Sequence, residues 1–186
     1  PHRLRASTPQ ELQARVALAP GPIHIHIAGQ TREVDACLAW SGQRPVEWLY
    51  ANAAVDARWC LVHATHVNSD EVRLMADSGA VVGLCPITEA NLGDGLFPMR
   101  DFIQLGGRFG VGSDSNVLID VAEELRLLEY GQRLQLRGRN VLSPGDLSSG
   151  RWLYQQAGEG GAQALGVPFG LEVGAAADLL ELDDEH

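Results

Sequence analysis

The chain has 186 residues, of which 45% are hydrophobic and 20% are charged, so it can bury a globular core and is not typical of a disordered protein. Its 24 acidic and 14 basic residues give a net charge of −10, which argues against nucleic acid or an anionic membrane as a partner. No run approaches the roughly 20 apolar residues of a membrane helix. All basic residues are arginines, which excludes lysine chemistry.

The three cysteines, Cys37, Cys60 and Cys85, are widely spaced and form no Cys-x-x-Cys pair. Each lies in an apolar run, so we interpret them as small core residues. This pattern, together with the lack of a signal-peptide core in the first five residues, predicts a reducing, cytoplasmic location.

Short β-type runs alternate with helical patterns along the chain. An alternating Ile/His run and three mostly apolar runs predict strands at 22–28, 59–64, 80–85 and 108–112. Helices are expected at 33–40, 46–54, 72–77 and 118–137, with others opening at Pro98 and spanning 154–166. Asn68 is expected to cap the helix at 72–77, and Gly79 to end it. Residues 86–95 are expected to form a loop.

Strand–helix alternation of this kind predicts a parallel sheet, and no Gly-x-Gly-x-x-Gly follows any strand, so a dinucleotide site lacks its fingerprint. A full (β/α)8 TIM barrel needs about 250 residues, and four units are half of one. We therefore expect an α/β fold that is half of such a barrel over residues 1–166. Residues 167–186, with a strand at 175–182, would begin a truncated C-terminal β segment.

Three metal-competent side chains lie at the carboxyl ends of separate strands: His26, His63 and Asp114. Functional groups of parallel α/β folds gather at the carboxyl ends of strands. Imidazole and carboxylate are ligands of catalytic zinc, which makes hydroxide available near neutral pH. Each residue alone has a structural explanation, since strand-end histidines often only donate hydrogen bonds and Asp114 could cap a turn.

Other residues compete for these roles. His24 lies two residues before His26, faces the same side of the strand and is the closest competitor for the metal. His66 follows His63 in the loop. His2 and Arg5 precede the first strand, and an arginine fork there could select an anionic substrate or could simply be solvated.

Together these segments resemble the zinc-dependent amidohydrolases, and among them the formimidoylglutamate deiminase family. The resemblance covers nearly the whole chain. It is carried by His2-x-x-Arg5, His24-Ile25-His26-Ile27-Ala28, Trp59-Cys60-Leu61-Val62-His63-Ala64-Thr65-His66, Thr88-Glu89-Ala90-Asn91-Leu92-Gly93-Asp94-Gly95 and Gly112-Ser113-Asp114-Ser115.

The resemblance implies that the chain supplies strands 5–8, the C-terminal half, of the barrel. It implies a zinc ion, with iron or manganese as alternatives, held by His26 and by Asp114, which would also handle a proton. His63 would polarise the formimino group. His2, Arg5 and Ser113 would hold the glutamate part of a dicarboxylate substrate. The reaction implied is hydrolysis of N-formimino-L-glutamate to N-formyl-L-glutamate and ammonia, a step of histidine degradation.

The chain departs from this family at several positions. Two further zinc ligands of the family come from a His-x-His on a first strand that this sequence lacks, and Gly29 stands where the family has a proton-shuttling glutamate. Asn116 stands where related enzymes carry histidine. We therefore expect impaired activity, and a homo-oligomer or a complementing N-terminal half as partner. The alternatives are a deaminase of another cyclic or amidine substrate, and a non-catalytic half-barrel module.

Overall fold

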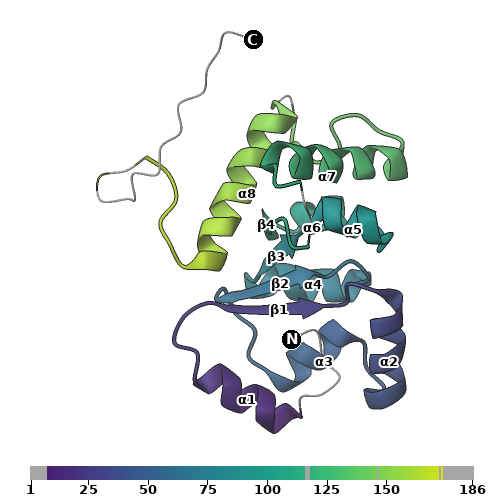
Figure 1. Cartoon of the computed structure of the whole chain (residues 1–186), viewed down its shortest axis with the longest axis vertical. Helices are drawn as coiled ribbons and strands as arrows, with labels where there is room; N and C mark the ends of the chain where they lie inside the picture. The colour runs from purple at the N-terminus through teal and green to yellow at the C-terminus, as the bar shows by residue number, and fades with distance from the viewer. Residues whose placement is uncertain (1–7, 116–117, 146, 172, 174–186) are drawn as a thin grey trace.

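The computed structural model describes residues 8–115, 118–145, 147–171 and 173 (Figure 1). Within these residues, four short strands form one parallel sheet in the order β1-β2-β3-β4. This confirms the expected parallel α/β arrangement, although which strands of a barrel they represent stays a prediction. The strands are β1 Ile23–Ile27, β2 Trp59–His63, β3 Val81–Leu84 and β4 Arg108–Val111.

Both faces of the sheet are covered, which explains why most of the strands read as continuous apolar runs. Leu61 of β2, Val82 of β3 and Phe109 of β4 lie side by side on one face and belong to the main core. Cys60 and its partner Val81 lie on the opposite face and pack with Ala164 in a second, smaller cluster.

Helices connect the strands and cover the sheet. In Figure 1, α1 to α3 gather beside β1, whereas α7 and α8 lie beyond β4. Across the described ranges, no helix combines the length and the hydropathy that a membrane crossing requires. The helices are α1 Pro9–Ala17, α2 Thr31–Ser41, α3 Pro45–Asn52, α4 Ser69–Ser78, α5 Pro86–Leu92, α6 Met99–Gln104, α7 Val121–Leu136 and α8 Ser149–Leu165.

The expected cap of α4 is present. The Asn68 side chain accepts hydrogen bonds from the backbone N–H groups of Asp70 and Glu71, and Glu71 accepts one from the Asn68 N–H in return. Gly79 ends the helix in the left-handed conformation, at φ 72°. Local capping rules thus fix both ends of α4.

The segment expected to be a loop at 86–95 is instead a helix over most of its length, α5. Pro86 occupies the first turn and Gly93 ends the helix at φ 69°, and both are ordinary helix-boundary signals. The prediction was wrong because a seven-residue helix is too short to show an apolar period. α1, which the sequence analysis did not anticipate, begins after a capping box formed by Thr8 and Glu11.

The C-terminal end of α8 closes the amino ends of the strands. The Gln163 side chain donates to the carbonyl oxygens of Ala57, just before β2, and Gly79, just before β3. Arg108, the first residue of β4, donates to the Gln163 side chain. The expected strand at 175–182 lies outside the described residues, so the division after residue 166 stays a prediction.

Candidate active site

Strained backbone marks the carboxyl ends of the strands. Six described non-glycine residues have positive φ, and four of them follow or end a strand: Ala28, His63, Ala64 and Asp114, at 49°, 70°, 49° and 45°. Such conformations cost on the order of 1–3 kcal/mol each and persist where the surrounding structure holds them, often at functional sites. This end of the sheet is therefore where a site is expected.

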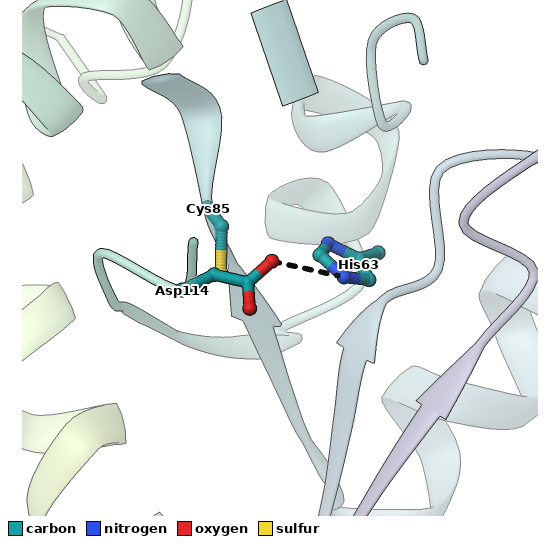
Figure 2. Close-up of side chains that lie close together, drawn as sticks. All are labelled: His63, Cys85 and Asp114. Atoms are coloured by element: carbon teal, nitrogen blue, oxygen red, sulfur yellow. Dashed lines mark ion pairs between the residues drawn. The ribbon is translucent and has the colours of Figure 1, made fainter. Parts of the chain in front are cut away.

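His63 lies between two carboxylates. Its Nδ1 is 3.1 Å from Glu89 Oε1, and its Nε2 is 3.7 Å from Asp114 Oδ2 (Figure 2 draws the second pair). The ring is also close to His26, with 5.4 Å between ring centroids. The side chains of His63 and Glu89 are only 12% and 7% exposed, so both groups interact in a largely dry setting.

The surroundings of His63 act on its pKa in opposite directions. Burial of the ring lowers the pKa, but the hydrogen bond to Glu89 and the negative charges of Glu89, Asp114 and Asp94 raise it. The net result is a raised pKa, because the carboxylates stabilise the imidazolium. A histidine poised in this way can hold a proton and donate it to a bound group.

A pocket of about 310 Å³ opens at this edge of the sheet. It brings together the three residues that the sequence analysis placed at strand ends, although His26 comes from one edge strand of the sheet and Asp114 follows the other. The lining residues are His26, Ile27, Gly29, Gln30, Glu33, His63, Leu92, Asp94, Asp114 and Ser115.

Cys85 adds a sulfur atom next to this pocket. Ligand atoms of His63, Cys85 and Asp114 all lie within 4.8 Å of one another, and Figure 2 shows the three side chains facing a common point. Burial, with the negative charges of Glu89, Asp114 and Glu124, raises the pKa of the Cys85 thiol to about 12. Cys85 is thus buried as expected, but it lies against the site and not only in the core. Cys60 is a buried core thiol, whose pKa burial raises to about 11.

The two histidines of β1 have different surroundings. His24 Nε2 donates to the carbonyl oxygen of Ala164 in α8, at 2.7 Å, so His24 belongs to the closed amino end. His26, one pleat further along, lines the pocket. His66 does not line that pocket; its backbone N–H donates to Ala28 and its carbonyl accepts from Arg44. Of these three histidines, His26 is the one that lines the pocket, and its role as a metal ligand stays a prediction.

The residues expected to bind the substrate are only partly described. His2 and Arg5 lie outside the described residues. The carbonyl oxygen of Ser113 accepts a hydrogen bond from Thr88, at 2.9 Å, while Ser115 lines the pocket. The role expected for Ser113 stays a prediction, and the hydroxyl-bearing residue that lines the pocket is Ser115.

Sequence reasoning missed several polar residues of the site. Glu89 was hidden because residues 86–95 were expected to form a loop. Glu33 accepts hydrogen bonds from the backbone N–H groups of Ala28 and Gly29, at 3.0 and 3.2 Å, and thereby holds the strand end. Asp94 accepts from Gln30, at 3.0 Å, across 64 residues of chain. Such long-range pairs leave no periodic signal, although the acidic residues of the 88–95 segment were visible.

Comparisons with known proteins identify the family of this chain. The family model described as Amidohydrolase family matches residues 1–185. A formimidoylglutamate deiminase of Pseudomonas aeruginosa is 61% identical over 98% of this chain and 41% of its own length. The crystal structure of an amidohydrolase from Brucella melitensis, 56% identical, superposes with a TM-score of 0.87 over 89% of this chain and 37% of that one.

A zinc-containing relative is also similar. An adenosine deaminase from Xanthomonas campestris, solved with bound zinc, is 25% identical, with a TM-score of 0.76 over 86% of this chain and 36% of its own. This chain therefore spans less than half the length of each of these relatives.

Proposed function

The chain belongs to the amidohydrolase family, and on that premise we propose that its pocket serves hydrolytic removal of ammonia from N-formimino-L-glutamate. The observation that carries the proposal is the shared pocket of His26, His63 and Asp114, in a chain 61% identical to a formimidoylglutamate deiminase. The strands would be the fifth to eighth of the barrel.

His63, Cys85 and Asp114 offer ligand atoms within 4.8 Å of one another, and His26 lines the same pocket, so the pocket holds donors that suit a divalent metal. His26 and Asp114 would hold zinc, with iron or manganese as alternatives, and Cys85 lies close enough to Asp114 to add a sulfur donor. When bound, the ion lowers the pKa of water and polarises the bond under attack. The two ligands that the family draws from its first strand would have to come from a part of the protein outside this chain, or from a partner.

The protein side chains supply the proton transfers and the substrate contacts. Asp114 accepts the proton of the attacking water, and the largely buried His63, in its imidazolium form, donates a hydrogen bond from Nε2 to the formimino nitrogen. His2, Arg5 and Ser113 hold the two carboxylates of the substrate, since guanidinium and hydroxyl donors match carboxylate oxygens. In this account Gly29 leaves the amine without its usual proton donor, a loss of about 10²–10⁴ in rate.

Complementation tests this proposal. The chain is co-expressed with the N-terminal half of the Pseudomonas aeruginosa relative, and ammonia release from N-formimino-L-glutamate is measured with and without Gly29→Glu. A Cβ at position 29 would lie 3.2 Å from His63 Cδ2, so Gly29→Ala serves as the matched control for crowding. We expect Gly29→Glu to raise the rate and Gly29→Ala to leave it low. Equal ammonia release after Asp114→Ala contradicts the proposal.

An adenosine-type substrate is a second candidate, because a relative of known structure is an adenosine deaminase. The two substrates differ in charge, so Arg5→Ala separates them. It should cost several kcal/mol of transition-state binding for a dicarboxylate and leave adenosine deamination unchanged.

A non-catalytic half barrel is the third candidate, favoured by Gly29 and by the position of β1 and β4 at the two edges of the four-stranded sheet. It predicts a dimer or larger species in light scattering and no tightly bound metal. A monomer with stoichiometric zinc would exclude it.

A further inference from the structure

We propose that Glu89 is the positioning residue for His63: it accepts the Nδ1 hydrogen and thereby turns Nε2 toward Asp114 and the pocket. The proposed function gives His63 its part in the reaction, and this inference rests on the proposed function in that respect alone. The orientation and the tautomer of the ring can be measured without any substrate.

The geometry comes from the first turn of α5. Glu89 Oε1 accepts from the backbone N–H of Cys85, at 3.0 Å, and lies 3.1 Å from His63 Nδ1. The first contact fixes the carboxylate against its own helix, so the oxygen that meets the imidazole has a defined place. Because an ionised carboxylate only accepts hydrogen bonds, this contact places a hydrogen on Nδ1.

The opposite nitrogen is then directed into the site. Nε2 faces Asp114 at 3.7 Å, which is longer than a hydrogen bond and leaves the nitrogen available to a bound group. Asp114 and Asp94 also place negative charge around the ring, and the ring of His26 lies beside it. Of these groups, Glu89 is the one within hydrogen-bond distance of the ring.

The neighbouring residue, Thr88, extends this arrangement. Its hydroxyl donates to the carbonyl oxygen of Ser113, the residue before Asp114, at 2.9 Å. Consecutive residues of α5 therefore hold the two strand ends that meet in the pocket, Glu89 at β2 and Thr88 at β4. Residues 88 and 89 are 3% and 5% exposed, so water does not compete strongly for either contact.

A structural explanation has to be separated from this one. Glu89 could only cap the first turn of α5, through the Cys85 N–H, without setting the ring of His63. Glu124 provides the matched control: it is also a buried carboxylate, 2% exposed, and it accepts the Ile87 N–H of the same helix at 2.8 Å. If both carboxylates only stabilise α5, substitution of Glu89 and substitution of Glu124 should have the same effect on His63.

The test is nitrogen-15 NMR of the histidine rings in this chain, at an alkaline pH where the ring is neutral. We expect His63 to be the Nδ1–H tautomer in the wild type and in Glu124→Met, and to shift toward the Nε2–H tautomer in Glu89→Met, which removes the acceptor of Nδ1–H. Should Glu89→Met not fold, Glu89→Asp keeps the charge but falls one methylene short of the ring. An Nε2–H tautomer in the wild type, or an Nδ1–H tautomer that persists in the folded Glu89 variant, overturns the proposal.

The complemented enzyme gives the second readout. Glu89→Gln should lower kcat for ammonia release about 10- to 100-fold with little change in KM, whereas Glu124→Gln should leave kcat near the wild-type value. Equal losses of kcat in the two variants count against positioning. If no variant releases ammonia from this substrate, the proposed function fails while the tautomer result still decides the role of Glu89.

Discussion

The two ends of the parallel sheet use similar residues for different purposes. At the amino end, His24 donates to a helix carbonyl, and α8 packs so closely that a Cβ at Gly160 would overlap the carbonyl oxygen of Phe109. At the carboxyl end, His26 and His63 line a pocket among carboxylates, and His63 itself has a positive φ. The chain thus closes one end with close packing and keeps polar groups accessible at the other.

The largest loss of stability is expected at the carboxyl end of the sheet, where Arg44 pairs with a buried carboxylate. Arg44 donates to the fully buried Glu71, at 2.7 Å, and to the His66 carbonyl, at 2.6 Å. Arg44→Met would leave Glu71 buried without its cation and should lower the free energy of unfolding by about 3–5 kcal/mol, measured by urea denaturation. The exposed pair of Arg58 and Asp56 is the control, since Arg58→Met should cost less than about 1 kcal/mol. Similar losses in both variants would show that burial of Glu71 is not what matters.

The amino end should be sensitive to added volume. Gly160→Ala would force α8 away from Phe109 and should cost about 1–3 kcal/mol. Gly161→Ala, on the same helix, meets no neighbour within 4 Å and should instead stabilise by up to about 1 kcal/mol through helix propensity. Thermal melts of the pair check the sign, and a stable Gly160→Ala protein would contradict the close approach.

A smaller effect separates the two histidines of β1. His24→Gln removes a hydrogen bond to Ala164 and should cost about 1 kcal/mol of stability while leaving zinc binding unchanged. His26→Gln should weaken zinc binding, measured by calorimetry. Weaker zinc binding in His24→Gln, with unchanged zinc binding in His26→Gln, would place the metal site at His24.

The smallest effect concerns thiol reactivity. Because the pKa values of Cys60 and Cys85 are raised to about 11 and about 12, their thiolate fraction is very low near neutral pH and grows as the pH rises toward those values. Half-buried Cys37 should therefore be alkylated first in the folded chain, and all three thiols should react alike in urea. Rapid labelling of Cys85 in the native chain would mean that its sulfur is more accessible than the structure indicates.

Much of this comparison could be predicted from the sequence, because it depends on local rules. An alternating Ile/His run and three mostly apolar runs located the four strands, and Asn68 and Gly79 located the ends of α4. The convergence of His26, His63 and Asp114 followed from the rule that strand ends share one edge of a parallel sheet.

Other features depend on contacts between distant residues and could not be read from local patterns. Glu89 reaches His63 over 26 positions, and Gln163 reaches Ala57 over 106. The difference between His24 and His26 also lies in α8, not in β1, since Ala164 supplies the acceptor that makes His24 structural.

Anomalous diffraction from zinc-soaked crystals of the complemented protein tests the account most directly. We predict zinc about 2.0–2.2 Å from a ring nitrogen of His26 and from a carboxylate oxygen of Asp114, at the carboxyl end of the sheet. Zinc bound at His24 or elsewhere on the chain, with the pocket of His26 and Asp114 free of metal, would contradict the account.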